Sequence, residues 1–267
     1  MVNLYTQANN GKYTMDEFLE IMKKLRAPDG CPWDKEQTHA SIRNNFLEET
    51  YEVVDAIDRD DSTDMCEELG DVLMQIVFHS VMAEEENRFD FSDVIDGVSK
   101  KLVYRHPHFF GDVVAETSEK VLDNWEKLKR VEKSQEPYSD TLKSVPAAFP
   151  ALLRAQKVQK RASKAGYDFT SVIDAFEKIG EEACELKSEL SKGDKVKLTD
   201  ELGDLLFSVV NIGRLLGIDC EEALSRSTVK FTDRFEKAER KIIADGYDIK
   251  ELSADKLDEY WEKAKND

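Results

Sequence analysis

The chain has few of the residues that build disulfide scaffolds or histidine-containing metal bundles. Its 267 residues include only 4 cysteines and 4 histidines, and no two cysteines form a C-x-x-C pair. A disulfide framework is therefore not expected, and a reducing cytoplasm is the default location. No histidine follows an acidic motif at the Glu-x-x-His spacing, which disfavours a di-iron carboxylate bundle.

Positive charge is also scarce, because 38 Lys and Arg residues face 56 Asp and Glu residues and give a formal net charge of −18. Without a basic excess to displace counterions, we expect no nucleic acid and no anionic membrane surface as partner. A small phosphate compound is still compatible with this charge if metal ions neutralise both sides locally.

The sequence also lacks long apolar runs, a signal-peptide pattern and a Walker A motif. No run approaches the length of a bilayer span, and residues 1–14 lack the basic and then apolar layout of a signal peptide. We therefore expect a cytoplasmic protein without an export signal. The Walker A pattern G-x-x-x-x-G-K-[ST] is absent too, which argues against a P-loop phosphatase.

The chain does contain an acidic sequence motif that occurs twice. Each copy reads E-E-x-x-E and then, after a gap, E-L-G-D, and a single offset of 133 residues relates the copies. The first copy begins at Glu48 and the second at Glu181. Since 267 residues suffice for two ordinary hydrophobic cores, the repetition favours two domains of one kind.

The spacing of these acids places them in pairs, because residues three or four apart share one face of a helix. The pairs are Glu49 with Glu52, Glu68 with Asp71, Glu182 with Glu185, and Glu201 with Asp204. Packing the two helices of a copy together would gather four carboxylates, whose repulsion and desolvation require a cation between them. Because all the ligand atoms are oxygens, we expect Mg²⁺, or Mn²⁺ in its place.

A basic pair and a tryptophan follow the acids in both halves. Lys101 and Arg105 lie one helical turn apart, as do Lys230 and Arg234, and Trp261 has a counterpart near the end of the first half. Alone, such pairs are more typical of surface ion pairs, and such tryptophans are equally typical of core or interface anchors. The repeated order of acids, bases and an aromatic ring indicates instead a site for a nucleotide polyphosphate.

In such a site each group has a chemical task. A bound metal would activate a water molecule for attack on phosphorus, and Glu181 or Glu182 is the candidate acceptor of its proton. Lys230 and Arg234 would hold phosphate oxygens, and Trp261 could stack on a base.

The hydrophobic spacing predicts helices throughout. Apolar residues recur at helical intervals over residues 15–25 and 93–105, and a sustained alternation typical of strands is missing. We predict an all-α protein with two tandem helical-bundle domains, residues 1–131 and 151–267, joined by a proline-containing linker over residues 132–150.

Prolines and glycines make two further predictions. The motifs Cys31-Pro32-Trp33-Asp34 and Arg105-His106-Pro107-His108 are expected to form loops, because proline interrupts the helical pattern in both. Gly70 and Gly203 lie inside expected helices, which suggests that another helix approaches closely at these points.

Taken together, these motifs resemble the MazG family of nucleoside triphosphate pyrophosphohydrolases. The likeness rests on C-P-W-D, E-E-x-x-E, E-L-G-D and R-H-P-H-x-F-G-D in this order, on the second acidic copy, and on R-A-Q-K-x-Q-K-R from Arg154 to Arg161. It extends over nearly the whole chain, from about Phe18 to Lys265.

The resemblance implies an all-α NTP pyrophosphohydrolase fold, a homodimer, and Mg²⁺-dependent hydrolysis of NTPs or dNTPs to the monophosphate and pyrophosphate. The family's metal ligands fall on Glu182, Glu185, Glu201 and Asp204. Its phosphate and nucleotide contacts fall on Lys197, Lys230, Arg234 and Trp261. The second half is the one usually credited with activity.

The first half keeps the acids Glu49, Glu52, Glu68 and Asp71 and the bases Lys101 and Arg105, so it too is expected to hold metal. However, Asp64 stands where the second half has Lys197, and the loss of a positive charge beside the phosphates should weaken substrate binding.

A second hypothesis from another class explains the same acids. A non-catalytic helical protein could bind divalent metal through its acidic bundles, or dock a regulatory partner, without any turnover. Under that hypothesis, substituting Glu182 or Asp204 would change only stability or partner binding.

Overall fold

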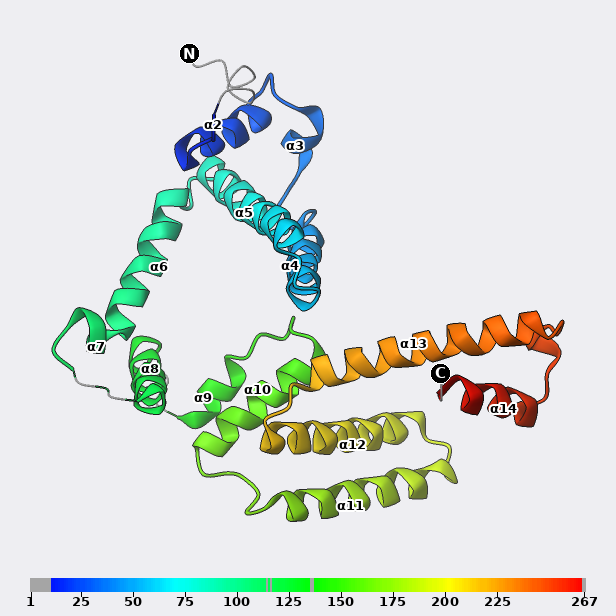
Figure 1. Ribbon diagram of the computed structural model, residues 1–267. Coiled ribbons are helices and arrows are strands. Elements are labelled where there is room, and N and C mark those ends of the chain that lie inside the picture. Colours follow the sequence, from blue (N-terminus) through cyan, green and yellow to red (C-terminus); the bar gives the residue numbers. More distant parts are fainter. Residues whose placement is uncertain (1–10, 114, 116, 135–136, 266–267) are drawn as a thin grey trace. The chain divides into compact units, whose positions relative to one another are not determined.

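The structure, a computed structural model, describes residues 11–113, 115, 117–134 and 137–265. These residues form helices, turns and loops, and no strand occurs among them (Figure 1). The prediction of an all-α chain is thereby confirmed. The expectation about residues 1–14 falls largely outside the described residues, because the description begins at residue 11.

The chain divides into two compact units, Met1–Glu126 (unit 1) and Lys127–Asp267 (unit 2). The division falls within helix α8, which runs over Ser118–Glu132. The domain boundaries at residues 131 and 150 stay predictions.

Unit 1 is built around two long helices that pack against each other, α4 and α5, with α2 on the second of them. Its helices before α8 are α2 (Met15–Arg26), α3 (Pro32–Glu36), α4 (Arg43–Asp58), α5 (Ser62–Glu85), α6 (Phe91–Arg105) and α7 (Pro107–Phe110). The core forms where α2 meets α5, because Met22 packs there with Val77, Phe78 and Val81, all at most 5% exposed.

Unit 2 repeats this plan with α11 and α12 as the packed pair and α10 on the second helix. Its helices are α9 (Tyr138–Lys143), α10 (Ala151–Lys164), α11 (Val172–Leu190), α12 (Lys195–Leu216), α13 (Cys220–Ala244), the short 3₁₀ helix η1 (Ile249–Glu251) and α14 (Ala254–Lys265). A separate core joins α13 to α14, where Ile242 packs with Tyr260 and Ala264.

Two predicted loops contain short helices instead. Pro32 begins α3 and Pro107 begins α7. Proline is tolerated at the first position of a helix, because that position has no intrahelical partner for its N–H and proline already has a helical φ. The prolines thus start new helices as well as interrupting the preceding helical pattern, so the prediction of loops is wrong from Pro32 and from Pro107 onward.

The segment predicted to be a linker contains α9, which packs on α10. The guanidinium of Arg161 on α10 donates hydrogen bonds to the Thr141 carbonyl oxygen and, over 2.8 Å, to Ser144 Oγ. Thr141 and Val145 are buried. Part of this polar, proline-containing stretch is therefore packed into unit 2.

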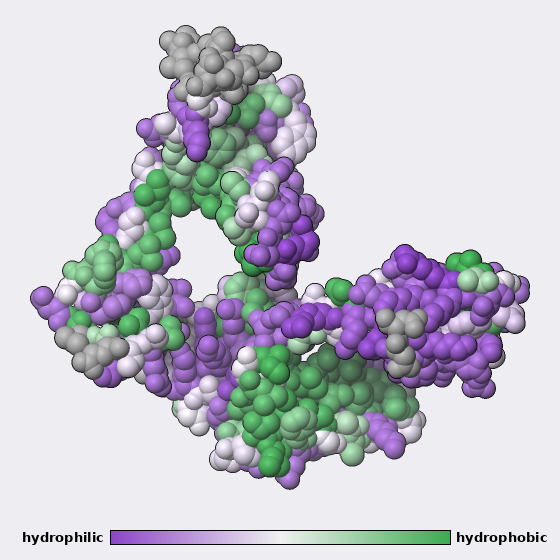
Figure 2. Space-filling model, in the orientation of Figure 1, coloured by the Kyte–Doolittle hydropathy of each residue, from purple (hydrophilic) through white to green (hydrophobic). Residues whose placement is uncertain are grey.

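Large apolar side chains remain exposed on unit 2, and Figure 2 shows a hydrophobic patch over α11 and α12. We call the exposed apolar side chains of α11 and α12 the unit 2 patch: Ile173, Phe176, Leu190, Val196, Leu202, Leu206, Phe207, Val209 and Leu216. Burial of such side chains stabilises an interface, so this surface suits a packing partner.

The prediction that another helix approaches closely at Gly70 and Gly203 is wrong for the described part of a single chain. A Cβ atom built on Gly70 or Gly203 meets nothing within 4 Å, so no other part of the described chain approaches closely at either position. Among the described residues, no helix is both long and apolar enough to cross a membrane.

Candidate metal centre and active site

The two acidic copies become two helical hairpins, α4 with α5 and α11 with α12. The second helix of each hairpin begins with the same cap. The Asp61 side chain accepts hydrogen bonds from the N–H groups of residues 63 and 64, and Asp194, 133 residues later, accepts them from residues 196 and 197. Equivalent caps fix where each helix starts, and so they fix which face carries the E-L-G-D acids.

In both hairpins, three of the predicted acids bring one carboxylate oxygen each within 4.8 Å of the others (Glu49, Glu68 and Asp71 in unit 1; Glu182, Glu201 and Asp204 in unit 2). We call these groups the first and the second acid cluster. The members correspond residue by residue at the offset of 133. Two separate hairpins of this protein therefore build the same geometry.

The fourth acid of each motif, Glu52 or Glu185, lies outside these groups of three. Both still act on their clusters electrostatically. The charge of Glu52 raises the pKa of Glu49 and Glu68, and the charge of Glu185 raises the pKa of Glu201. Each therefore lies close to its cluster without being one of the three converging acids.

The clusters are electrostatically unfavourable as they stand. Burial, and then the neighbouring carboxylates, raise the pKa of Glu201 above its ordinary value, and the same causes raise the pKa of Glu68. A bound cation would remove this repulsion.

The residues present fit a cation on other grounds too. The Glu68 Oε2 atom is buried without a hydrogen-bond partner, as is Oε2 of Glu189, a buried glutamate whose charge reaches Glu201. Buried carboxylate oxygens without partners are unusual in folded proteins. An all-oxygen donor set suits a hard divalent cation.

Unit 2 adds a lysine that the sequence analysis missed. Lys178 Nζ lies 2.7 Å from Glu182 Oε1 and 3.0 Å from Glu181 Oε1. Glu182 is 5% exposed, whereas Glu181 is exposed. The spacing of four residues between Lys178 and Glu182 was the available signal, since such pairs meet on a helix. Unit 1 has Asn45 at the equivalent position.

Lys197 lies on the same face of α12 as Glu201 and Asp204, because the residues are spaced by four and then three. Its side chain is exposed. In unit 1, Asp64 occupies this place and forms an ion pair with Arg59. The position beside the acids is therefore positive in unit 2, whereas in unit 1 it carries a carboxylate already paired with an arginine.

Each tryptophan contacts the helix that carries its basic pair. In unit 2, Trp261 on α14 packs against Phe231, which lies between Lys230 and Arg234 on α13, with ring centroids 5.1 Å apart. In unit 1, the Arg105 guanidinium lies 5.3 Å from the ring of Trp125. Arg105 is buried and Lys101 is exposed. A base therefore meets its tryptophan directly in unit 1, whereas in unit 2 the contact of Trp261 is with Phe231.

The bases of α13 do not meet the acids of the second cluster within the described chain. α13 leaves α12 at their junction, where Cys220 Sγ lies 3.6 Å from the Val210 carbonyl oxygen, and it then diverges from the α11–α12 hairpin (Figure 1). Lys230 and Arg234 lie beyond this junction, toward α14. The predicted phosphate-binding role of Lys230 and Arg234 would therefore require another approach of α13 to the acids.

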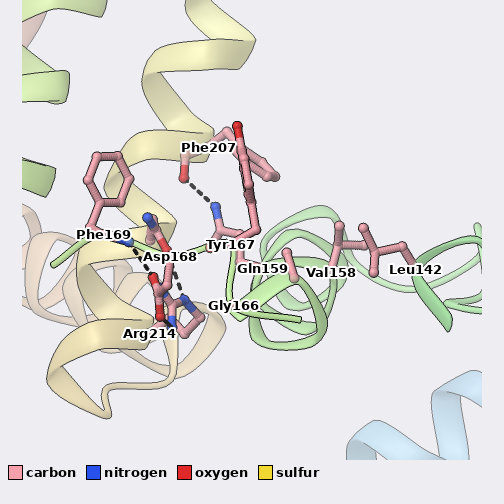
Figure 3. Close-up of a pocket in the computed structure, with 11 residues that line it drawn as sticks. Leu142, Val158, Gln159, Gly166, Tyr167, Asp168, Phe169, Phe207 and Arg214 are labelled. Atoms are coloured by element: carbon pink, nitrogen blue, oxygen red, sulfur yellow. Dashed lines mark hydrogen bonds and ion pairs between the residues drawn. The ribbon is translucent and has the colours of Figure 1, made fainter. Parts of the chain in front are cut away.

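A cavity of about 500 Å³ lies beside α12, beginning one helical turn beyond Asp204 at Phe207 (Figure 3). Gln159 Nε2 donates a 2.7 Å hydrogen bond to the Phe207 carbonyl oxygen, and its Oε1 is buried without a partner. Arg214 and Asp168 form an ion pair in the wall. The cavity is mostly apolar with a few polar groups, which is typical of a small-molecule site.

Comparison with known proteins gives a consistent result. Residues 37–110 and 164–238 each match the MazG nucleotide pyrophosphohydrolase domain. Each matched segment contains one acid cluster and one basic pair.

Relatives match over nearly the whole chain. It is 45% identical over 254 residues to an Escherichia coli (strain K12) protein named nucleoside triphosphate pyrophosphohydrolase, covering 94% of this chain and 97% of that protein. It is 44% identical over 250 residues to a Thermotoga maritima protein named nucleoside triphosphate pyrophosphohydrolase/pyrophosphatase MazG, covering 94% and 95%. A Bacillus subtilis protein named uncharacterized protein YabN is 44% identical over 249 residues, covering 93% and 51%.

Proposed function

The chain belongs to the MazG family of nucleotide pyrophosphohydrolases, and we propose on this basis that it hydrolyses NTPs or dNTPs to the nucleoside monophosphate and pyrophosphate. One observation carries the proposal beyond family membership. The second acid cluster combines three converging carboxylates with Lys197 on the same helix face, so metal and phosphate binding groups are adjacent.

The metal in this proposal is Mg²⁺, with Mn²⁺ as an alternative. Glu182, Glu201 and Asp204 would hold it, with Glu185 as a fourth ligand. A divalent cation bound there supplies charge neutralisation for phosphate oxygens and lowers the pKa of a coordinated water. Lys178 neutralises Glu181 and Glu182 in its absence.

The other side chains of unit 2 have separate tasks in the reaction. Glu181, which is exposed and not a member of the cluster, is the proposed proton acceptor for the attacking water, with Glu182 as the alternative. Lys197 would bind phosphate oxygens and offset the charge that develops on the pyrophosphate leaving group.

Lys230 and Arg234 would bind the phosphates, and Trp261 would stack on the base. In the first half, Lys101 and Arg105 would bind the phosphate of a nucleotide at the first cluster. For the unit 2 set to reach the acids, α13 must pack near an acid cluster. We propose that a homodimer provides this contact by covering the unit 2 patch. Apolar area of this kind is the usual centre of an obligate interface.

The reaction is tested by its products in ¹⁸O-labelled water, with Mg²⁺ and each dNTP in turn. The proposal predicts monophosphate and pyrophosphate, with the label on the monophosphate, because the water attacks the α-phosphorus. A diphosphate with orthophosphate would contradict the reaction class, and label in pyrophosphate would contradict attack at this atom.

The dimer is tested by light scattering of the wild type and of Leu206→Glu, which places a charge in the unit 2 patch. Leu73→Glu, at the equivalent position of unit 1, is the matched control. We expect a dimer for the wild type and the control and a monomer for Leu206→Glu. A monomeric wild type, or a dimer that survives Leu206→Glu, would contradict the proposed interface.

A further inference from the structure

Unit 1 contains a cavity of about 130 Å³ that opens directly onto its acid cluster. Glu49 belongs both to the cluster and to the wall of the cavity. The rest of the wall comes from four helices or their flanks and includes Met22 of α2, Trp33 of α3, Asn45 of α4 and Gln75 of α5. A ligand in this cavity would therefore lie against Glu49, one of the three acids of the first cluster.

Gln75 supplies a hydrogen-bond acceptor that nothing in the described chain uses. The residue is 5% exposed, and its Oε1 is buried without a partner. Its side chain also lies beside Glu49, where it partly offsets the rise that burial causes in the pKa of that carboxyl group. A buried acceptor of this kind is costly unless a ligand or water donates to it.

Trp33 offers a flat apolar surface at the opening. It lines the cavity and is nevertheless 59% exposed, so one part of the indole faces solvent. An exposed tryptophan beside polar groups suits stacking on a nucleobase, which has an aromatic face and N–H donors on its edge.

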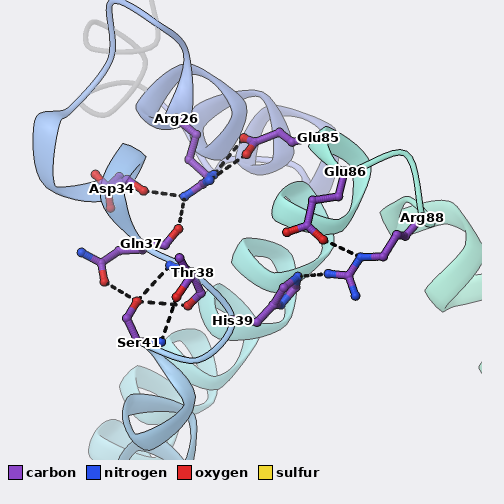
Figure 4. Close-up of polar contacts among 9 residues, drawn as sticks. All are labelled: Arg26, Asp34, Gln37, Thr38, His39, Ser41, Glu85, Glu86 and Arg88. Carbon is purple, nitrogen blue, oxygen red and sulfur yellow. Dashed lines mark hydrogen bonds and ion pairs between the residues drawn. The ribbon is translucent and has the colours of Figure 1, made fainter.

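The helix that carries Trp33 is held in place. The Arg26 side chain, 8% exposed, donates hydrogen bonds to the carbonyl oxygens of Asp34 and Gln37 and forms a 2.7 Å ion pair with Glu85 (Figure 4). These bonds tie α3 to α2 and α5. The backbone that carries Trp33 is therefore held before any ligand arrives, which reduces the entropic cost of binding.

This cavity is not a copy of the second site. Asn45 and Gln75 stand where unit 2 has Lys178 and Ser208. Two neutral amides thus replace a lysine and a small hydroxyl. Amides read the edge of a base through paired donors and acceptors, whereas a lysine serves mainly as a point charge.

The position that carries Lys197 in unit 2 offers no positive charge of its own in unit 1. Asp64 stands there, paired with Arg59, so a lysine that could hold the outer phosphates of a triphosphate is missing. A single phosphate bridged by a cation to the first cluster avoids this position.

We infer that unit 1 binds a nucleoside monophosphate together with a divalent cation, with the base in the cavity between Trp33 and Gln75. The choice of a monophosphate rests on the proposed function, because this nucleotide is the product of that reaction. Unit 1 would then be a product-binding site in the same chain as the catalytic site.

The test is calorimetric titration of the full chain carrying Glu182→Gln and Asp204→Asn, so that the second site is disabled. The probes are the four deoxynucleoside monophosphates, each with and without Mg²⁺. We expect Mg²⁺-dependent binding that Trp33→Ala and Gln75→Met each weaken at least about tenfold. Ser208→Ala, at the position of unit 2 that corresponds to Gln75, is the matched control and should leave the affinity unchanged.

Circular dichroism of each variant confirms that it folds, and Trp33→Phe should restore part of the affinity by keeping an aromatic face. Affinities unchanged by both substitutions, or binding that needs no Mg²⁺, would overturn the inference. Tighter binding of an α,β-methylene dNTP than of the monophosphate would overturn the choice of a monophosphate. Because binding is measured without turnover, a chain that hydrolyses no NTP but passes this test contradicts only the proposed reaction.

Discussion

Units 1 and 2 carry the same acid cluster in different surroundings. Their three converging carboxylates correspond residue by residue, as do the aspartate caps of α5 and α12. The neighbouring positions differ, with Asp64, Asn45 and Gln75 in unit 1 against Lys197, Lys178 and Ser208 in unit 2. The helical hairpin therefore brings the three carboxylates together in both units, whereas the side chains around them differ in charge and size.

On the function proposed above, this difference corresponds to a division of labour between the units. Unit 2 has cationic side chains next to its acids, which would suit a triphosphate and the charge of a leaving group. Unit 1 has neutral amides and an exposed tryptophan there, which would suit recognition without turnover.

The largest expected effect comes from removing the metal. Chelation should lower NTP turnover by roughly 1,000-fold or more, because a catalytic cation contributes several kcal/mol to the transition state. Turnover by the chelated chain, with and without added Mg²⁺, is the measurement. Activity that persists after chelation would remove the chemical reason for both acid clusters.

A smaller effect is expected from the charge that distinguishes the units. Lys197→Ala should lower kcat/KM for dNTPs by about 10 to 100-fold, since a hydrogen bond to a charged group contributes about 1.5–3 kcal/mol. The matched change Asp64→Ala should leave kcat/KM within about twofold. Equal losses in steady-state assays of the two variants would show that both units turn over substrate.

The next prediction concerns pH. Burial and nearby carboxylates raise the pKa of Glu49, Glu68 and Glu201 above the ordinary value of 4.5. In the window between 4.5 and the raised values, these groups bind more protons in the folded chain than in the unfolded one. Their contribution to stability is therefore largest at acid pH and falls as the pH rises through this window.

Mg²⁺ competes with these protons for the carboxylates, so the stabilisation that Mg²⁺ provides should increase as the pH rises. We expect the increase in Tm caused by Mg²⁺ to be small near pH 4 and to grow through the same window, reaching its full size by about pH 7. Thermal unfolding with and without Mg²⁺ measures it. Asp71→Asn and Asp204→Asn should each remove part of the increase, and an increase that is lost entirely in one variant would mean that only that cluster binds metal.

The smallest expected effect concerns the glycines of the two E-L-G-D motifs, one in α5 and one in α12. Gly70→Ala and Gly203→Ala should each stabilise the chain by about 1 kcal/mol, because alanine favours a helix and the added methyl group has open space at both sites. The free energy of unfolding in urea is the measurement. A loss for Gly203→Ala would show that the proposed dimer contact reaches the side of α12 on which Gly203 lies.

Much of this architecture could be predicted from the sequence because it depends on local patterns. Helical spacing and the repeat gave the hairpins, and the i, i+3 spacing of Glu201 and Asp204 placed both acids on one face. The grouping of three acids instead of four depends on how the helices pack, which the spacing of Glu185 does not determine.

Other features depend on contacts between distant residues, and sequence patterns do not record these. The position of α13 away from the acids follows from its packing on α14. The importance of Gln75 lies in an unpartnered oxygen beside Glu49, 26 residues earlier in the chain. Trp33 appeared to belong to a loop because a proline that starts a helix resembles one that ends it.

The most direct measurement is single-turnover dNTP hydrolysis by full-length Glu182→Gln and Glu49→Gln, the same change at equivalent positions of the two clusters. Glu182→Gln should lower the rate of monophosphate and pyrophosphate formation by about 100-fold or more, because it removes charge from the reacting centre. Glu49→Gln should leave that rate within about twofold. Equal losses in the two variants, or a loss confined to Glu49→Gln, would contradict the division of labour between the units.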